Sequence, residues 1–390
     1  MKAFLALVSF LLNFLSYPLV SQSIQKKGNQ RIDSKYRFYL GADLSYVNEL
    51  EDCGAQFRDK GVEKDVYRIF ADHQCSIARI RIWHLANWTS YSNLEDVKKS
   101  IRRAKFHGMR VLLDFHYSDN WTDPARQMIP MAWREVPNDS ILGDSVYKYT
   151  ESVLMALYKE DLLPEMVQVG NEINAEILQK TEKAVYPIQW KRNVFLLNKG
   201  LAAVNAVSKK TKSPIATMLH IAQPDQAFYW FQKARENGIA PFDWIGLSYY
   251  TQWSKFNLNQ LGKEIALLKK TFNKRVMIVE AGYPFTLVNA DSANNLLDTV
   301  SQLPGYSISL LQQKRFMINL TSTVLKSGGE GVIYWEPAWI STPCKTQWAQ
   351  GSHWDNATFF GNENPHNALP VFDFFSEKLY PDVVNSSGKK

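Results

Sequence analysis

The sequence predicts an α/β fold: a single (β/α)8 TIM barrel with long loops after its seventh and eighth strands. Two observations support this prediction. Short apolar runs recur eight times along the chain, and segments with helical periodicity lie between them. The alternative is a doubly wound open sheet, which would need a glycine-rich phosphate loop after its first strand. Residues 41–45 stand at that place, read Gly-Ala-Asp-Leu-Ser, and do not form such a loop.

The eight apolar runs are predicted to be strands. Each is too short for a helix and is rich in Val, Ile, Leu and aromatic residues, which is typical of buried parallel strands. Each run also ends in polar or aromatic residues. The predicted strands cover residues 38–44, 77–83, 109–117, 166–172, 215–220, 244–250, 276–280 and 331–335.

Five segments between the strands have the period of an amphipathic helix. In the segment 94–106, for example, one face carries Leu94, Val97, Ile101 and Ala104, and the other face carries Lys and Arg. Gly108 and Gly238 stand where they would end helices. The predicted helices cover residues 94–106, 146–158, 189–207, 260–272 and 310–326.

Composition excludes several classes of protein. Of the 390 residues, 45% are hydrophobic and 21% are charged, a balance that excludes a disordered chain. The net charge of +7 comes from Lys and Arg scattered in short pairs, so no nucleic-acid partner is expected. Three cysteines are too few for a disulfide scaffold or a four-cysteine metal site. Nothing in the sequence indicates a protein partner, and we expect a monomer.

The N-terminus has the pattern of a secretory signal peptide. Lys2 precedes an apolar run, and the small residues Ser21 and Ser23 follow it as a cleavage site. An N-terminal membrane anchor is the alternative, but the run is short and is interrupted by Asn13 and Pro18. We therefore expect a signal peptide at 1–23, one barrel domain at 24–390, and export to the periplasm or the outside of the cell.

Two glutamates stand at the ends of predicted strands that face each other across the barrel. Glu172 ends the fourth strand and Glu280 ends the seventh. In such barrels the chemistry lies where strands end and the following loops begin. Two carboxylates there can act on one bond from opposite sides, as glycoside hydrolysis requires. The alternative interpretation makes one or both glutamates structural partners of Arg79 or Arg81.

The residues around these positions resemble a known family. The run Leu-Asp-Phe-His-Tyr-Ser-Asp-Asn-Trp-Thr-Asp-Pro at 113–124 is similar to the signature of glycoside hydrolase family 53, the endo-β-1,4-galactanases. The similarity continues at 41–45, 79–83, 170–172, 246–250, 279–284, 334–339 and 351–357, and so covers nearly the whole chain after the signal segment. Thr251-Gln252 stands where the family often has Pro-Phe, and Gly282 is a second departure.

The resemblance implies endo-acting, retaining hydrolysis of β-1,4-galactosidic bonds in galactan and type I arabinogalactan. Glu172 would be the general acid/base and Glu280 the nucleophile, with carboxyl groups about 5–5.5 Å apart. No cofactor is expected for the reaction. A related β-mannanase or β-glucanase would share both glutamates. A non-catalytic sugar-binding barrel would normally have lost one of them.

Further residues are expected to hold substrate or to support the two glutamates. Arg81 is predicted to keep Glu280 ionised, and Tyr249 to orient it. His116 and Asn171 are predicted to hydrogen-bond the sugar at the cleavage point. The remaining substrate-binding candidates are one acid and four possible ring platforms: Asp43, Trp83, Trp121, Trp253 and Trp335.

A structural calcium ion is predicted between the loops after strands seven and eight. Asn289, Asp291 and Asn295 form an alternating oxygen pattern, which lets a tight loop turn its oxygens onto one hard cation. By resemblance to bacterial members of the family, Ser352 and Asp355 would complete the site. The alternative is that these are ordinary turn residues bonded to nearby backbone.

A disulfide between Cys53 and Cys344 is predicted, with Cys75 left free. Cys53 follows the first strand and Cys344 the eighth, and these strands are neighbours in a closed barrel. Cys75 precedes the second strand and should lie at the opposite end. Export to an oxidising compartment would permit the bridge.

Overall fold

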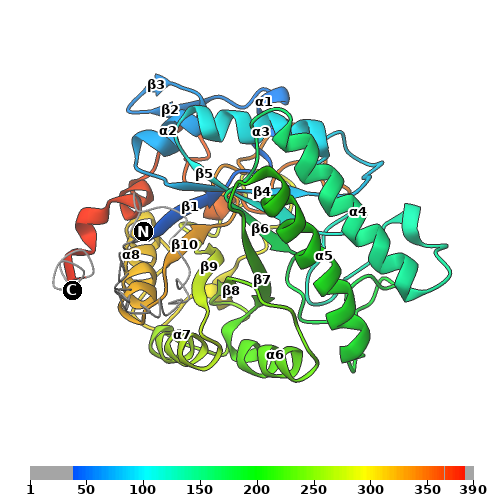
Figure 1. Cartoon of the computed structure of the whole chain (residues 1–390). Coiled ribbons are helices and arrows are strands. Elements are labelled where there is room, and N and C mark those ends of the chain that lie inside the picture. The colour runs from blue at the N-terminus through cyan, green and yellow to red at the C-terminus, as the bar shows by residue number, and fades with distance from the viewer. Residues whose placement is uncertain (1–37, 364, 383–390) are drawn as a thin grey trace, which may run out of the picture. The chain divides into compact units, whose positions relative to one another are not determined.

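The computed structural model describes residues 38–363 and 365–382, and eight parallel strands within them close into a barrel (Figure 1). The order around the barrel, β1-β10-β9-β8-β7-β6-β5-β4, makes sequential strands neighbours and excludes the doubly wound sheet. All eight predicted strands are barrel strands. Their bounds are β1 Tyr39–Asp43, β4 Ile77–Ile82, β5 Arg110–Phe115, β6 Met166–Val169, β7 Ala216–Ala222, β8 Trp244–Tyr250, β9 Arg275–Gly282 and β10 Gly331–Tyr334.

The helices surround the barrel, and all five predicted helices are present. They are α3 Leu94–Phe106, α4 Asp139–Tyr158, α5 Trp190–Thr211, α7 Leu258–Phe272 and α8 Leu310–Lys326. Three further helices were not predicted: α1 Val47–Asp52, α2 Val66–Asp72 and α6 Pro224–Glu236. The first two are short, and α6 begins with a proline, which is well tolerated in the first turn of a helix.

Local capping explains where these helices begin. Asn93 accepts hydrogen bonds from the backbone of Glu95 and Asp96 at the start of α3. Asn257 and Gln260 form a reciprocal capping box at the start of α7. As predicted, α3 ends just before Gly108 and α6 just before Gly238. Short elements complete the fold: β2 Phe57–Asp59, β3 Val62–Glu63, β11 His366–Asn367, η1 Met131–Trp133, η2 Thr299–Ser301, η3 Asp355–Ala357, η4 Pro370–Phe375 and η5 Glu377–Leu379.

The barrel interior changes from apolar to polar along the strands. A buried apolar cluster with members from all eight strands fills the part nearer the strand beginnings: Tyr39, Ile77, Leu112, Met166, Ala216, Met218, Trp244, Met277, Val279 and Ile333. Polar side chains follow toward the strand ends: Asp43, Arg79, Arg81, Asp114, Gln168, His220 and Ser248 on the same alternation, and Glu280 after a shift of register. Buried charge is costly unless paired, so this concentration marks the carboxyl end as the functional face.

An irregularity in β9 directs Glu280 toward the interior. Met277 faces Gly246 of β8, and strict alternation would turn Glu280, three residues later, to the opposite side. The pairing shifts by one residue after Leu247, so that Ser248 lies opposite Glu280. Such a bulge re-aims the side chains that follow it, and here it brings Glu280 to the same level as Ser248.

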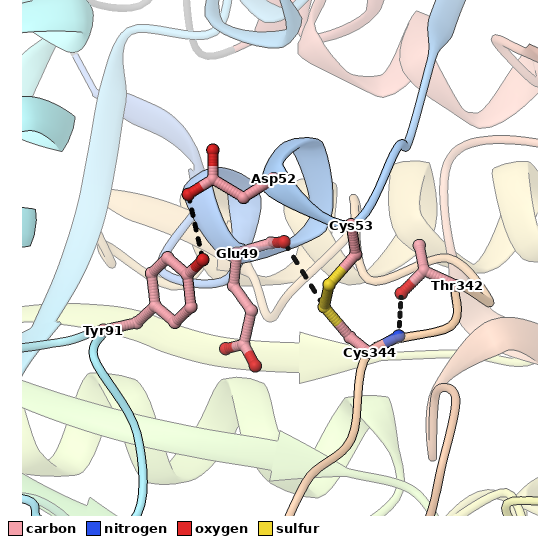
Figure 2. The surroundings of a disulfide bond; sticks show 6 residues. All are labelled: Glu49, Asp52, Cys53, Tyr91, Thr342 and Cys344. Carbon is pink, nitrogen blue, oxygen red and sulfur yellow. Dashed lines mark hydrogen bonds between the residues drawn. A yellow bond between two sulfur atoms is a disulfide. The ribbon is translucent and has the colours of Figure 1, made fainter.

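Cys53 and Cys344 form the predicted disulfide, with Cα atoms 5.7 Å apart, while Cys75 is free and buried. Figure 2 shows that the bridge joins the end of α1 to the loop after β10. The backbone N–H of Cys344 donates to Thr342 Oγ1 beside it, at 3.2 Å. The bridge therefore holds the loop of the last barrel strand against the first helix of the chain.

The predicted signal peptide at 1–23 lies outside the described residues, so the division of the chain after residue 23 stays a prediction. Within residues 38–363 and 365–382, every helix is too short or too polar to cross a membrane.

Candidate active site

The structure brings Glu172 and Glu280 together at the carboxyl end of the barrel. Glu172 follows β6 and Glu280 lies within β9, and both are buried. One carboxylate oxygen of each glutamate and a ring nitrogen of His220 lie within 4.8 Å of one another. Glu172 has a φ of 43°, in the left-handed region, which non-glycine residues adopt at a cost of about 1–3 kcal/mol. Strain of this kind is concentrated at functional sites.

Glu280 is held by one cation and one hydroxyl. Arg79 Nη2 lies 2.9 Å from Glu280 Oε1, and the Tyr250 hydroxyl donates to Oε2 at 2.9 Å. Burial raises the pKa of Glu280 to about 7, while Arg79 and the Tyr250 hydrogen bond act in the opposite direction. Both contacts favour the ionised carboxylate, which is the form that a nucleophile needs.

Arg79 is the centre of the buried charge network. Its guanidinium contacts Asp43 Oδ2 at 2.7 Å and Asp114 Oδ2 at 2.8 Å, in addition to Glu280. Its Nη2 also donates to Asn171 Oδ1 at 2.7 Å. One planar cation thus links strands β1, β4, β5 and β9 to the residue that precedes Glu172.

Two predicted partners of Glu280 were wrong. Arg81 lies 3.0 Å from Glu336 rather than beside Glu280, and its guanidinium is stacked among aromatic rings. The Tyr249 hydroxyl donates to the backbone oxygen of Phe256, because neighbouring residues of a strand point to opposite faces. Arg79 is the cation that pairs with Glu280, and Tyr250 is the tyrosine that hydrogen-bonds it.

The surroundings of Glu172 as a whole favour its protonated form. Burial and the charge of Glu280 raise its pKa well above the usual value and Asp123 adds to this effect, while the hydrogen bond from Ser248 acts in the opposite direction. Ser248 Oγ donates to Glu172 Oε1 at 2.5 Å, and His220 Nε2 lies 2.8 Å from Ser248 Oγ. Two neighbouring carboxyl groups in such an environment hold one proton between them near neutral pH, and Glu172 is the better place for it because Arg79 pairs with Glu280.

Three polar residues predicted to contact sugar have other partners. His116 uses both ring nitrogens inside the protein, with Asp114 at 3.0 Å and the backbone N–H of Thr122 at 3.1 Å, so it supports the network and does not bind sugar. Asp43 is fully buried between Arg79 and Ser45 and is likewise unable to reach a ligand. Asn171 donates one amide hydrogen to the Thr122 carbonyl, which leaves the second amide hydrogen for a sugar hydroxyl.

The aromatic residues predicted to be sugar platforms divide into buried and exposed side chains. Trp83 is 2% exposed and packs against Trp88 and Trp121, so it is a core residue and not a platform. Trp253 is 48% exposed, and its ring packs edge-on against Tyr250 beside Glu280. Trp121 and Trp335 pack together, 5.8 Å between ring centroids, with Trp335 8% exposed.

Gly282, a departure from the family pattern, makes room for a supporting ring. A Cβ atom at this position would lie 2.3 Å from the Trp354 ring. Trp354 packs edge-on against Trp335, 4.8 Å between centroids, and against Tyr250. Glycine here therefore lets the loop after β10 hold Trp335 in place.

The residues predicted to bind calcium lie together between the loops after β9 and β10. Asn295 Nδ2 donates to Asn289 Oδ1 at 2.6 Å and to Asp355 Oδ1 at 2.7 Å, and the Ser352 N–H donates to Asp291 Oδ2 at 2.7 Å. The Ser352 hydroxyl is directed elsewhere, to the Trp339 carbonyl. Burial and the charge of Asp291 raise the pKa of Asp355. Across 38–363 and 365–382, neither aspartate pairs with a Lys, Arg or His side chain.

The sequence interpretation missed roles for Arg79, Tyr250, Ser248 and His220. Strand alternation offered a signal for Tyr250 and Ser248, which share the face of Trp244 in β8. No comparable signal separates Arg79 from Arg81, because both point into the barrel. Only the depth of each residue within the barrel decides which one meets Glu280.

Comparison with known proteins identifies the family. The sequence model of glycosyl hydrolase family 53 matches residues 39–375. This chain belongs to glycosyl hydrolase family 53. Among curated family 53 relatives, an arabinogalactan endo-β-1,4-galactanase from Cellvibrio japonicus is 52% identical over 339 residues, covering 87% of this chain and 90% of its own length. An endo-β-1,4-galactanase from Bacillus subtilis is 33% identical, covering 80% of this chain and 72% of its own length.

Solved structures of family 53 agree with the fold. The catalytic domain from Ignisphaera aggregans has a TM-score of 0.79 and 27% identity, covering 89% of this chain and 97% of its own. A fungal β-1,4-galactanase has a TM-score of 0.74 and 27% identity, covering 86% and 98%. The barrel is thus that of a family 53 glycosyl hydrolase.

Proposed function

We infer that this chain is an endo-β-1,4-galactanase, which hydrolyses internal β-1,4-galactosidic bonds of galactan and arabinogalactan. The observation that carries this conclusion is the Glu172–Glu280 pair at the barrel mouth of a family 53 chain. The identity of 52% with a curated galactanase supports the substrate. The reaction needs no cofactor, because two carboxyl groups supply both the nucleophile and the proton.

The chemistry follows from the different surroundings of the two glutamates. Glu280, ionised beside Arg79, attacks the anomeric carbon, while Glu172 donates its proton to the leaving oxygen. A galactosyl ester on Glu280 results. Glu172, now ionised, takes a proton from water, and the resulting hydroxide displaces Glu280 from the anomeric carbon. The two steps together return the proton to Glu172 and the negative charge to Glu280.

We propose that this mechanism retains the anomeric configuration. The close approach of the two carboxylates supports this, since their oxygens lie within 4.8 Å. Inverting enzymes hold a water between their carboxyl groups and need about 6.5–9.5 Å, whereas retaining enzymes need about 5–5.5 Å. The second amide hydrogen of Asn171 would bind the sugar 2-hydroxyl, where contacts strengthen in the transition state.

The experiment compares linear β-1,4-galactan with β-mannan and β-glucan, and follows the first product by NMR. We expect galacto-oligosaccharides from galactan alone, with the first new reducing end in the β form. Glu280→Ala should abolish turnover, while Glu236→Gln, at an exposed glutamate of α6, should not. An α-anomer as first product would contradict retention, and faster hydrolysis of mannan or glucan would contradict the substrate.

We also propose that a calcium ion binds at the cluster Asn289, Asp291, Asn295, Ser352 and Asp355. The donor set supports this proposal: two carboxylates lie near each other beside two amide oxygens, and no basic side chain of the described residues neutralises them. Ser352 would contribute through its backbone, because its hydroxyl is engaged by Trp339. The ion would fasten the loops after β9 and β10 and take no part in the reaction.

We propose, finally, that the protein is exported. The N-terminal sequence supports export, and so does the Cys53–Cys344 disulfide, because such bonds persist in oxidising compartments. Cell fractionation followed by N-terminal sequencing should find a mature chain that begins near residue 24, in the periplasm or the medium. Recovery of the chain in the cytosol with Met1 in place would contradict this proposal.

A further inference from the structure

Ser248 and His220 form a buried hydrogen-bond chain that ends on Glu172. Ser248 Oγ lies 2.5 Å from Glu172 Oε1, and His220 Nε2 lies 2.8 Å from the same hydroxyl. At the far side of the ring, His220 Nδ1 lies 3.0 Å from Asn171 Oδ1 and 3.3 Å from the backbone nitrogen of Glu172. Ser248 and His220 are fully buried, so neither can contact a sugar directly.

The hydrogen bonds run in one direction along this chain. Ser248 donates to Glu172 Oε1 and accepts from His220 Nε2–H, and the bare Nδ1 accepts from the Glu172 N–H and from Gln168 Nε2 at 3.1 Å. The same pattern serves both charge states of Glu172, because the proton of the acid is carried on Oε2, the oxygen that Ser248 does not hold.

His220 stays neutral, which this pattern of hydrogen bonds requires. Burial and the nearby cation Arg79 lower its pKa well below the usual value. The charged and titratable groups that face Glu172 from other elements are few: Arg79 from β4, Asp123 from the loop after β5, Tyr250 from β8 and Glu280 from β9. None of these groups hydrogen-bonds Glu172, so Ser248 is the side chain that fixes its carboxyl group within the part of the chain that the structure describes.

We propose that Ser248 and His220 are positioning residues that hold Glu172 in one orientation while its proton leaves and returns. This proposal rests on the function of Glu172 as the acid/base. Oε1 is held by Ser248, and Oε2 makes no hydrogen bond within residues 38–363 and 365–382 and so remains for the leaving oxygen and the attacking water. A carboxyl group that must act first as an acid and then as a base needs a partner that serves both of its states.

The first test separates positioning of Glu172 from general stability. In Ser248→Ala we expect kcat/KM on galactan to fall about 100-fold, the lower range for loss of general acid catalysis. On a dinitrophenyl β-galactobioside kcat/KM should stay within about threefold of wild type, since that leaving group needs no proton. For that substrate kcat should still fall, because the attack of water on the galactosyl ester needs Glu172 as a base. Ser248→Thr keeps the hydroxyl and should restore activity on galactan.

The matched control is Thr217→Val, which removes another buried hydroxyl from a barrel strand. Thr217 Oγ1 donates to Asp243 near the strand beginnings, away from Glu172. This variant should keep the wild-type ratio of kcat/KM between the two substrates. An equal loss on both substrates in Ser248→Ala, or no loss at all, would overturn the proposal.

The variant Glu172→Ala distinguishes the two levels of inference. If it fails to spare the activated substrate, Glu172 is not the acid/base and the proposed function of that residue fails. If it spares that substrate and Ser248→Ala does not, only the positioning role fails. NMR of the unaltered chain labelled with ¹⁵N-histidine gives an independent result. The chain requires a neutral His220 that keeps its proton on Nε2 while Glu172 titrates, and a proton on Nδ1 would overturn it.

Discussion

Arg79 and Arg81 are two residues apart on the same face of β4, and both are buried, yet their surroundings differ in kind. Arg79 is enclosed by oxygen atoms, from Asp43, Asp114 and Glu280 and from the amide of Asn171. Arg81 has a single carboxylate partner, Glu336, and its guanidinium lies over three aromatic rings: Tyr46 at 4.6 Å, Trp83 at 4.6 Å and Trp121 at 4.1 Å.

This difference shows how one strand can supply two functions at successive levels of a barrel. At the level of Arg79, the cation and the carboxylates set the charge state of Glu280. At the level of Arg81, a flat cation stacks with flat rings and fixes the position of Trp121, which packs against Trp335. We therefore expect changes at Arg79 to affect chemistry, and changes at Arg81 to affect stability and the shape of the sugar-binding surface.

Arg79→Lys should give the largest effect on activity. An ammonium group keeps the charge but cannot reach four acceptors in fixed directions, so Glu280 loses its orientation. We expect kcat/KM on galactan to fall about 10³-fold, as for the loss of one preorganised partner of a reacting group. The melting temperature measured in parallel should fall less than in the Arg81 variant. An activity near wild type would remove the distinction between the two arginines.

Arg81→Met should mainly destabilise the fold. The change leaves Glu336 buried without its cation, and breaking such a pair costs about 3–5 kcal/mol of unfolding free energy. Denaturant unfolding measures this loss, and the double variant Arg81→Met/Glu336→Gln should recover part of it. The kcat of the folded fraction should fall far less than in Arg79→Lys. A larger loss of kcat than in Arg79→Lys would reverse the comparison.

Tyr250→Phe should shift the acid side of the pH profile of kcat/KM. Glu280 must be ionised, so activity is lost as pH falls through its pKa of about 7. Since the Tyr250 hydrogen bond lowers that pKa, its removal should move the acid limb to higher pH. Tyr249→Phe is the matched control and should leave the limb in place, because its hydroxyl bonds Phe256. Identical profiles for the two variants would contradict the assignment.

Removal of calcium should have the smallest effect on the chemistry. If the ion fastens the loops after β9 and β10, chelation should lower the melting temperature by about 1–2 °C, the shift expected for about 1 kcal/mol when the unfolding entropy is about 2.1 cal/mol/K per residue in a domain of this size. Initial activity at low temperature should be unchanged, since neither arginine region includes the cluster. Asp291→Asn should reproduce the loss and abolish the response to EDTA. A melting temperature indifferent to EDTA would exclude the ion.

The sequence was sufficient for the barrel because its signals are repeated and local. Each of the eight strands combines an apolar run with a polar end, and each predicted helix shows one apolar face. The glutamate pair was predictable for the same reason, since each residue closes an apolar run of the sequence, although Glu172 lies beyond the end of β6 and Glu280 within β9. Helix α6 was not predicted although Pro224 and Gly238 bracket it, because the aromatic run 228–231 extends over more than one face: Trp230 and Phe231 are buried, whereas Tyr229 is 62% exposed.

The partners of the glutamates could not be predicted with the same success, because they depend on the stagger of neighbouring strands. Whether Arg79 or Arg81 meets Glu280 depends on how deep each lies, and the bulge in β9 changes the register at this place. The prediction that His116 binds sugar was wrong, because the loop that follows β5 folds back and the Thr122 backbone N–H donates a hydrogen bond to the His116 ring. Such a contact leaves no periodic trace in the sequence.

The disulfide has a consequence for damage to the chain. Cys53 and Cys344 are 291 residues apart in sequence, and the circuit that they close contains seven of the eight barrel strands. A protease that cuts one surface loop anywhere inside this circuit produces two pieces that are still one covalent molecule. The pieces cannot diffuse apart, so a nicked barrel can refold or persist as a unit, and reduction of a single bond is what would release them.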